Sequence, residues 1–152
     1  MDRNSTITKP FKKTVLGIFI FLGISFASFG QALLMDDKPA MDSMAKAVNL
    51  VYNFQFDKAG HCLLKYKTKY PNHPAFTLFN CISHFWKSFP IGSKPKEYSA
   101  YIRNLNLVIS QGEKLAEKHP KSPEPGFFIM MANLILARHH SEEGEYIKAV
   151  NE

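Results

Sequence analysis

The two proline motifs Lys69-Tyr-Pro71-Asn-His-Pro74 and Lys118-His-Pro120-Lys-Ser-Pro123 set the organisation of this 152-residue chain. Each motif follows a lysine-rich amphipathic segment and precedes a segment rich in aromatic residues, and the two stand 49 residues apart. Proline interrupts a helix because it lacks the amide hydrogen, yet it suits the first turn of a new one. Each motif therefore predicts the end of one helix and the beginning of the next, within an internal repeat.

Apolar residues recur at three- and four-residue steps on both sides of these motifs, which predicts amphipathic helices. No segment alternates as a strand does, and no Asn-Gly or Asp-Gly hairpin turn occurs. The predicted fold class is all-α, built from stacked antiparallel helix hairpins. Because Phe127–Ala137 is apolar almost all round, we expect it to be covered on several sides. We expect helices at about 41–54, from Asp57 to the residue before Pro71, from Pro74 to Phe89, at about 96–119, after Pro123 or Pro125, and from about Glu142.

The first 32 residues have the pattern of a secretory signal. A polar, basic start is followed by the apolar run Val15–Phe29 and then by small residues. The run is shorter than the ~20 residues that cross a bilayer comfortably, so we expect cleavage after Gly30 or Ala32 and export to the periplasm or cell envelope. The alternative is an uncleaved signal that anchors the chain in the inner membrane. On either interpretation, residues 33–40 form a polar leader and residues 41–152 form the helical domain.

The formal charge of +6 does not indicate a nucleic-acid partner. About half of it lies in the first 32 residues, where it suits a targeting signal. The remainder of the chain carries a nearly balanced set of basic and acidic residues, as ordinary solvated surfaces do.

Residues 41–152 resemble the tetratricopeptide repeat family. In that family the second helix of each hairpin carries an early alanine and a proline about twelve residues later, and Ala59 and Pro71 match this spacing. Near the C-terminus, Gly144-x-Tyr146-x-x-Ala149 has the family's turn, and Glu145–Ala149 also matches Gln55–Ala59. The chain departs from the pattern in its longer period, and at Val108 and Gly112. The residues that carry the repeat signature are Ala59, Pro71, Pro74, Pro120, Pro123, Gly144, Tyr146 and Ala149.

The resemblance implies a short superhelical array without catalytic activity, acting as a scaffold for a protein or peptide partner. The loop after the third helix is then expected to form the lip of a binding groove, with Trp86, Lys94, Lys96 and Tyr98. The last hairpin is incomplete at Glu152, so we expect either that the repeats continue in a longer protein or that the domain stands alone or is completed by a homodimer.

Cys62 and Cys81 are the only two cysteines. They flank the first proline motif at nearly the same height of the predicted hairpin, so a disulfide is geometrically allowed. Two buried thiols that pack as small apolar groups are the other interpretation.

Other candidate chemistry is sparse. The set His61, Cys62, His73, Cys81 and His84 lacks the paired spacing of a zinc site, so we expect no metal and no cofactor. Motifs for a nucleophilic serine, a phosphate loop or a metalloprotease helix are missing, so we expect no enzyme. The pair His139-His140 follows an apolar helix and suits its C-terminal end. Two hypotheses compete with the scaffold: a small exported redox or metal-binding protein based on Cys62, Cys81 and the histidines, and a membrane-anchored assembly component.

Overall fold

The computed structural model describes residues 32–142 and 144–151. Within this part of the chain the secondary structure is helical and contains no strand, which confirms the all-α prediction. Residues 1–31 of the predicted signal, which spans residues 1–32, lie outside the described residues. The helices are α2 (Lys38–Tyr52), α3 (Phe56–Lys69), α4 (Pro74–Ser88), α5 (Pro95–Lys118), α6 (Glu124–Glu142) and α7 (Tyr146–Asn151), and a single 3-10 turn, η1 (Ile91–Ser93), precedes α5.

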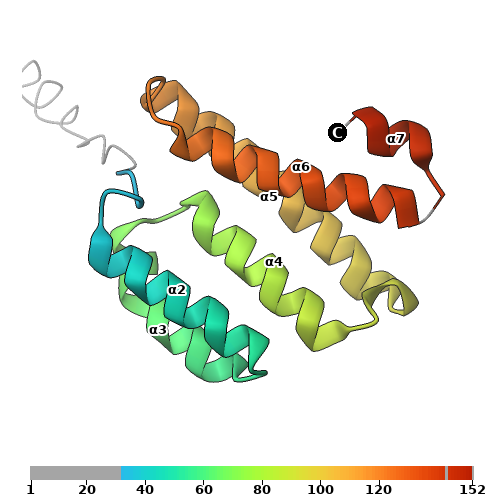
Figure 1. Ribbon diagram of the computed structural model, residues 1–152, viewed down its shortest axis with the longest axis horizontal. Coiled ribbons are helices and arrows are strands. Elements are labelled where there is room, and N and C mark those ends of the chain that lie inside the picture. Colours follow the sequence, from blue (N-terminus) through green and yellow to red (C-terminus); the bar gives the residue numbers. More distant parts are fainter. Residues whose placement is uncertain (1–31, 143, 152) are drawn as a thin grey trace, which may run out of the picture.

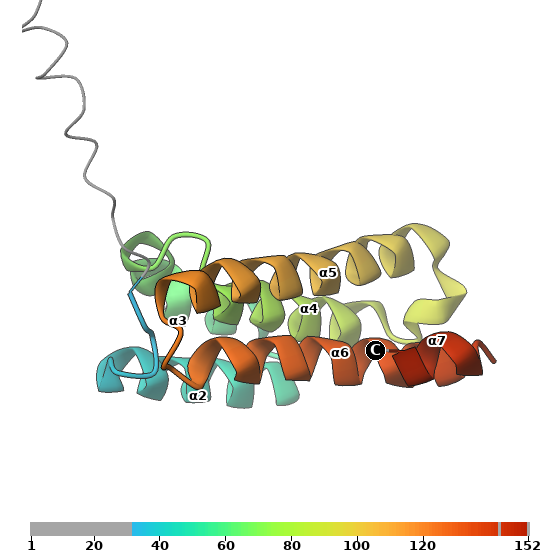
Figure 2. The same cartoon turned by 90° about the horizontal axis from the view of Figure 1, so that it is seen from above.

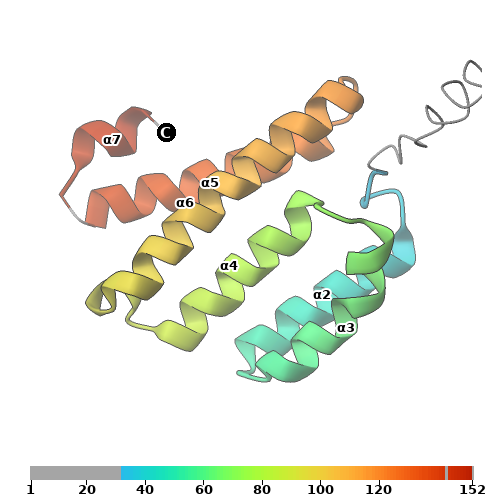
Figure 3. The same ribbon diagram turned by 180° about the vertical axis from the view of Figure 1, so that it is seen from behind.

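Consecutive helices pack as antiparallel hairpins (Figure 1). The closest helix pairs are α2 with α3, α4 with α5, α5 with α6, and α6 with α7. Seen from above, α2 and α6 lie on one side of the molecule and α3 and α5 on the other (Figure 2). Helix α4 lies between the α2–α3 hairpin and the α5–α6 pair (Figure 3), and it contacts all four of these helices.

The helix starts follow local sequence signals. Proline stands in the first turn of α2, α4 and α5, where its missing N–H is not needed. Asp37 caps α2 by accepting a hydrogen bond from the N–H of Ala40 at 3.1 Å. Helix α2 therefore begins at Lys38, ahead of the predicted start near residue 41.

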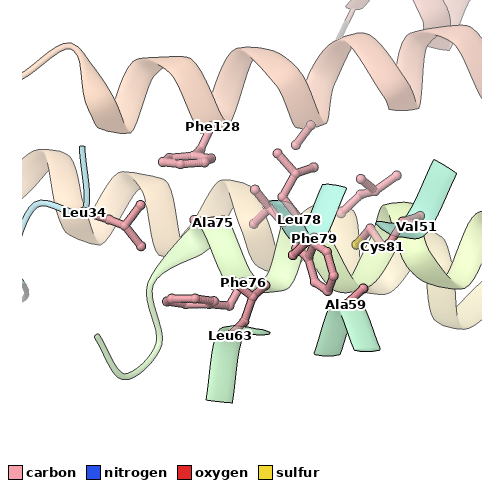
Figure 4. Packing of buried hydrophobic residues seen from close by; sticks show 14 of the residues in the cluster. Leu34, Val51, Ala59, Leu63, Ala75, Phe76, Leu78, Phe79, Cys81 and Phe128 are labelled. Carbon is pink, nitrogen blue, oxygen red and sulfur yellow. The ribbon is translucent and has the colours of Figure 1, made fainter. Parts of the chain in front are cut away.

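The leader segment belongs to the folded domain. Leu34 is only 1% exposed and packs in the same apolar cluster as Phe76 and Phe128 (Figure 4). Ala40 is also buried. Residues 33–40, which were predicted to form a polar leader, thus contribute Leu34 and Ala40 to the core.

Two small residues allow helices to approach closely. Ala59 is fully buried in α3, the partner of α2 in the first hairpin. Gly112 is buried in α5, and a Cβ placed there would lie 2.6 Å from Cγ1 of Ile129 in α6. In the sequence Gly112 stood out only as a departure from the repeat pattern; its role is to admit a branched side chain of the neighbouring helix.

Helix α6 packs against α4, α5 and α7 and leaves one face uncovered. Its buried side chains, among them Phe128, Ala132 and Leu136, face the core, whereas Phe127, Met130 and Leu134 are exposed. These three lie at steps of three and four residues and therefore share one face. The expectation that this apolar helix is covered on several sides is wrong for that face.

Candidate functional site

The two proline motifs form turns with the same hydrogen bonds. The N–H groups of Tyr70 and His119 donate to the carbonyl four residues earlier, at 2.8 and 2.9 Å. Those of His73 and Ser122 donate to the carbonyl three residues earlier, at 3.3 and 3.0 Å. The side chains of His73 and Ser122 also accept a hydrogen bond, each from the backbone N–H group two residues later in the chain.

A buried polar pair joins these two turns. His73 Nε2 lies 3.0 Å from Oε1 of Glu124, and both side chains are almost completely buried. His73 Nδ1 accepts the N–H of Ala75 at 3.3 Å, so the ring hydrogen sits on Nε2 and faces the carboxylate. The contact is a close polar pair with a bent geometry rather than a linear hydrogen bond.

Glu124 also holds the N-terminal segment. Its Oε1 accepts the N–H of Leu34 at 3.0 Å and its Oε2 accepts the N–H of Met35 at 3.1 Å. Burial opposes ionisation, but the contacts with His73, Met35 and Leu34 outweigh it and hold the pKa of Glu124 below its usual value. One carboxylate therefore ties the start of the domain to both proline turns.

Asp37 makes a second tie at the same end of the first hairpin. Its Oδ2 accepts bonds from Lys69 Nζ at 2.6 Å and from the Tyr70 hydroxyl at 2.7 Å. These two bonds, together with the N–H of Ala40, lower the pKa of Asp37 to about 2.

The turns that close α2 and α6 also correspond to each other. Phe54 and Gly144 each donate an N–H to the carbonyl three residues earlier, at 2.9 and 3.1 Å, and the next residue donates to the carbonyl five residues earlier, at 2.8 Å in both turns. This pattern requires a left-handed backbone, which is usually provided by glycine. Gly144 has φ 77° and Phe54 has φ 58°, so a phenylalanine takes the glycine position at the end of α2.

Phe54 belongs to a group of aromatic side chains at this end of the molecule, where the α2–α3 turn lies beside the end of α4 (Figure 1). The rings of Tyr52 and Trp86 are 5.8 Å apart, those of Trp86 and Phe89 6.2 Å, and those of Phe54 and Phe56 6.1 Å. Tyr52, Phe54 and Phe89 are 58%, 68% and 62% exposed. We use the name aromatic end for the five residues Tyr52, Phe54, Phe56, Trp86 and Phe89.

An open groove between α3 and α4 begins at the aromatic end. It has two adjoining parts, of about 350 and 420 Å³, that share Phe56, Asp57 and Lys87. Lys87 Nζ lies 5.2 Å from the centre of the Phe56 ring. Lys58 lines one part and Lys67 the other, so three lysines and one aspartate surround the groove. Its remaining lining residues are Phe54, Gln55, Gly60, His61, Leu64, Phe79, Asn80 and Ser83.

The four residues predicted to form a groove lip are not brought together as one surface. Trp86 packs against Tyr52 of α2, whereas Tyr98 packs against His139 of α6, with ring centres 6.0 Å apart. Lys94 and Lys96 are exposed at the start of α5. Only Trp86 belongs to the aromatic end.

Both cysteines are free thiols in the structure. Lys67 Nζ and Asn80 Oδ1, 3.4 Å apart, mark the facing sides of α3 and α4. At about 100° per residue, Cys62 and Cys81 point well away from those sides. Cys81 is fully buried, and burial raises its pKa to about 12. The two cysteines are predicted to lie at nearly the same height of the hairpin, but their side chains point in directions that do not bring the two sulfur atoms together.

The histidines occupy separate environments. His61 Nδ1 contacts the carbonyl of Asp57 at 2.8 Å, and His84 Nε2 contacts that of Glu97 at 3.3 Å. In residues 32–142 and 144–151, no three His, Cys, Asp or Glu side chains gather in a way that could hold a metal. In the last turn of α6, His139 lies 3.3 Å from the Tyr101 hydroxyl and His140 lies 2.8 Å from a carboxylate oxygen of Glu145.

The repeat-signature residues lie at equivalent points of the hairpins. Ala59 and Ala149 donate their N–H groups to Gln55 and Glu145, at 3.0 and 3.1 Å, in the first turns of α3 and α7. Pro74 is buried at the start of α4. The proline turns contain Pro71, Pro120 and Pro123. Gly144 lies in the turn that follows α6, and Tyr146 is the first residue of α7.

Sequence reasoning missed Phe54, Phe89 and Glu124. The sequence did contain a signal for Phe54. When the matching segments Gln55–Ala59 and Glu145–Ala149 are extended by one residue toward the N-terminus, Phe54 aligns with Gly144.

Comparison of the chain with family models, with curated proteins and with solved structures gives no match. None of the helices within the described residues combines the length and the apolar character that crossing a membrane requires.

Proposed function

We propose that this chain is a non-catalytic, exported scaffold of the cell envelope, built from tetratricopeptide-like helical hairpins, that binds a protein partner through the aromatic end. Three observations support the array: three successive hairpins, two proline turns with shared hydrogen bonds, and two helix-closing turns that correspond through Phe54 and Gly144.

One observation carries the binding site. Phe54 adopts a left-handed backbone conformation that costs a non-glycine residue about 1–3 kcal/mol, and its ring is exposed rather than buried. The equivalent turn uses Gly144 and avoids this strain. A strained, exposed aromatic side chain contributes little to folding, so we infer that its role is to contact a partner.

The chemistry of the groove favours, as the partner, an acidic peptide segment that carries an aromatic or aliphatic side chain. The exposed rings of Phe54 and Phe89 offer apolar area, and Lys58, Lys67 and Lys87 offer positive charge. A groove with polar groups in its wall suits an extended peptide better than a flat lipid surface.

The test is a selection of random displayed peptides on the immobilised wild-type protein, with depletion on a Phe54→Asn variant. We expect enriched peptides to combine aspartate or glutamate with an aromatic or leucine side chain. Their binding should weaken on the Lys87→Ala variant and as the salt concentration rises.

Two results would contradict the proposal. One is recovery of the same peptides from the wild-type and Phe54→Asn proteins. The other is sedimentation of the wild-type protein with anionic lipid vesicles, reduced by Phe54→Asn, without any peptide enrichment; the aromatic end would then be a membrane-contacting surface.

A further inference from the structure

Three donors lie around the buried carboxylate of Glu124. Two of these donors are the backbone N–H groups of Leu34 and Met35, and the third is the ring of His73, whose Nδ1 accepts a hydrogen bond. Among the residues that the structure describes, no lysine or arginine pairs with Glu124. An ionised carboxylate that is 1% exposed normally has a cationic partner.

The predicted signal cleavage site is close enough to supply a cation. Leu33 directly precedes Leu34, whose N–H lies 3.0 Å from Glu124 Oε1. Backbone nitrogens of adjacent residues are separated by only two bonded carbon atoms, or less than about 4 Å, so an amino group at Leu33 lies no more than about 7 Å from that carboxylate oxygen. The turn is held in place because Asp37 N–H donates to the Leu34 carbonyl at 3.0 Å.

We propose that hydrolysis of the Ala32–Leu33 bond creates an α-ammonium group that pairs with Glu124, so that processing places a cation beside this buried carboxylate. Water is the co-reactant: its oxygen bonds to the Ala32 carbonyl carbon as the C–N bond breaks, and the Leu33 nitrogen gains a hydrogen and is then protonated. The inference rests on the proposed export. It adds that cleavage after Ala32 places the new amino group next to a buried acceptor, the carboxylate of Glu124.

The new amino group would titrate beside a defined set of charged groups. Glu124 of α6 accepts the N–H of the next residue, Leu34, and pairs with the His73 ring. Asp37, held by Lys69 and the Tyr70 hydroxyl, lies further along the same segment. A free α-amino group has a pKa of about 7.7–8.0, and a nearby buried carboxylate raises that pKa.

The experiment uses the full chain, exported in cells and purified after processing. Intact mass gives the cleavage position, and the pH dependence of acetic anhydride labelling of the N-terminal peptide gives the pKa of its α-amino group. We expect a start at Leu33 and a pKa about one unit above the ordinary value. The pKa should return to the ordinary value in Glu124→Gln and in a variant with Gly-Gly inserted after Ala32, which keeps Glu124 intact if the first variant fails to fold.

Each other result overturns the inference in an identifiable way. An unprocessed chain contradicts both the inference and the proposed export. Processing at Leu33 with the same amine pKa in the wild-type and Gly-Gly proteins contradicts the ion pair alone, as does a start at Gln31. Peptide selection at the aromatic end is a separate readout that none of these results changes.

Discussion

Phe54 has a left-handed backbone with φ 58° and an exposed ring, so its removal should relieve strain. Asparagine tolerates this conformation well. We expect Phe54→Asn to leave the free energy of unfolding unchanged or to raise it by up to about 1 kcal/mol, measured by urea denaturation. Gly144→Ala is the matched control at the equivalent turn, where φ is 77°; it should lower stability by a similar amount. A clear loss of stability in Phe54→Asn would show that the ring serves the fold.

Gly112 tests a different residue-scale claim, namely that a missing side chain permits helix contact. A methyl group there would lie 2.6 Å from Ile129 Cγ1, whereas one at Gly60 meets nothing within 4 Å. We expect Gly112→Ala to destabilise the protein by about 1–3 kcal/mol. Gly60→Ala should stabilise it by about 0.5–1 kcal/mol, because alanine favours a helix. Equal thermal shifts of the same sign in the two variants would disprove close packing at Gly112.

Single residues were the hardest scale to predict from the sequence. Composition and periodicity identify Phe54 as one apolar residue among many, and only comparison of the two repeats distinguishes it. The pairing of His73 with Glu124 depends on two turns that are distant in the chain, although each residue adjoins a proline of the repeated motif.

At the scale of elements, Asp37 links the start of α2 to the end of α3, and its charge makes the link dependent on pH. Its pKa is about 2 in the folded protein, against 3.8 for an unperturbed aspartate. The stabilisation is therefore complete above about pH 5 and is lost progressively as the pH falls through 2. We expect Asp37→Asn, which retains a helix cap, to lower the melting temperature at pH 7, and we expect this difference to shrink as the pH falls through 2.

The control for this prediction is Asp42→Asn, which removes an exposed pair with Lys38 at 3.5 Å. It should have little effect at any pH, because exposed ion pairs contribute little to stability. A pH-independent difference between Asp37→Asn and the wild type would contradict the role of the charge.

Glu124 joins three elements, and its loss should be costly. Removal of the carboxylate leaves the N–H groups of Leu34 and Met35 and the His73 ring without an acceptor. We expect Glu124→Ala to lower the free energy of unfolding by about 3 kcal/mol in chemical denaturation. Glu142→Ala, which removes an exposed partner of Arg138, should cost less than about 0.5 kcal/mol. Similar losses in the two variants would argue against the junction.

Helix positions were predictable because proline, capping and periodic signals are local. The expected helix at 74–89 is observed as Pro74–Ser88, and that at 96–119 as Pro95–Lys118. The leader was misjudged because its structure depends on Glu124, far away in the chain. Export and the tetratricopeptide resemblance remain proposals.

At the scale of the whole molecule, stacking of the hairpins decides which side chains share a surface. The sequence placed Trp86 and Tyr98 on one groove lip because they are near each other in the chain. Packing separates them, since Trp86 faces α2 and Tyr98 faces α6. The aromatic end instead combines the first hairpin turn with the end of α4, a juxtaposition that only tertiary structure creates.

The central claim, that the aromatic end binds a peptide, is tested most directly by titration calorimetry of one selected peptide with three folded proteins. These are the wild type, Phe54→Asn and Leu134→Asn, the last of which replaces an exposed apolar residue of α6 by the same polar residue. The account predicts at least about tenfold weaker binding to Phe54→Asn, or about 1.4 kcal/mol, and unchanged binding to Leu134→Asn. Equal affinity for the wild-type and Phe54→Asn proteins would contradict it.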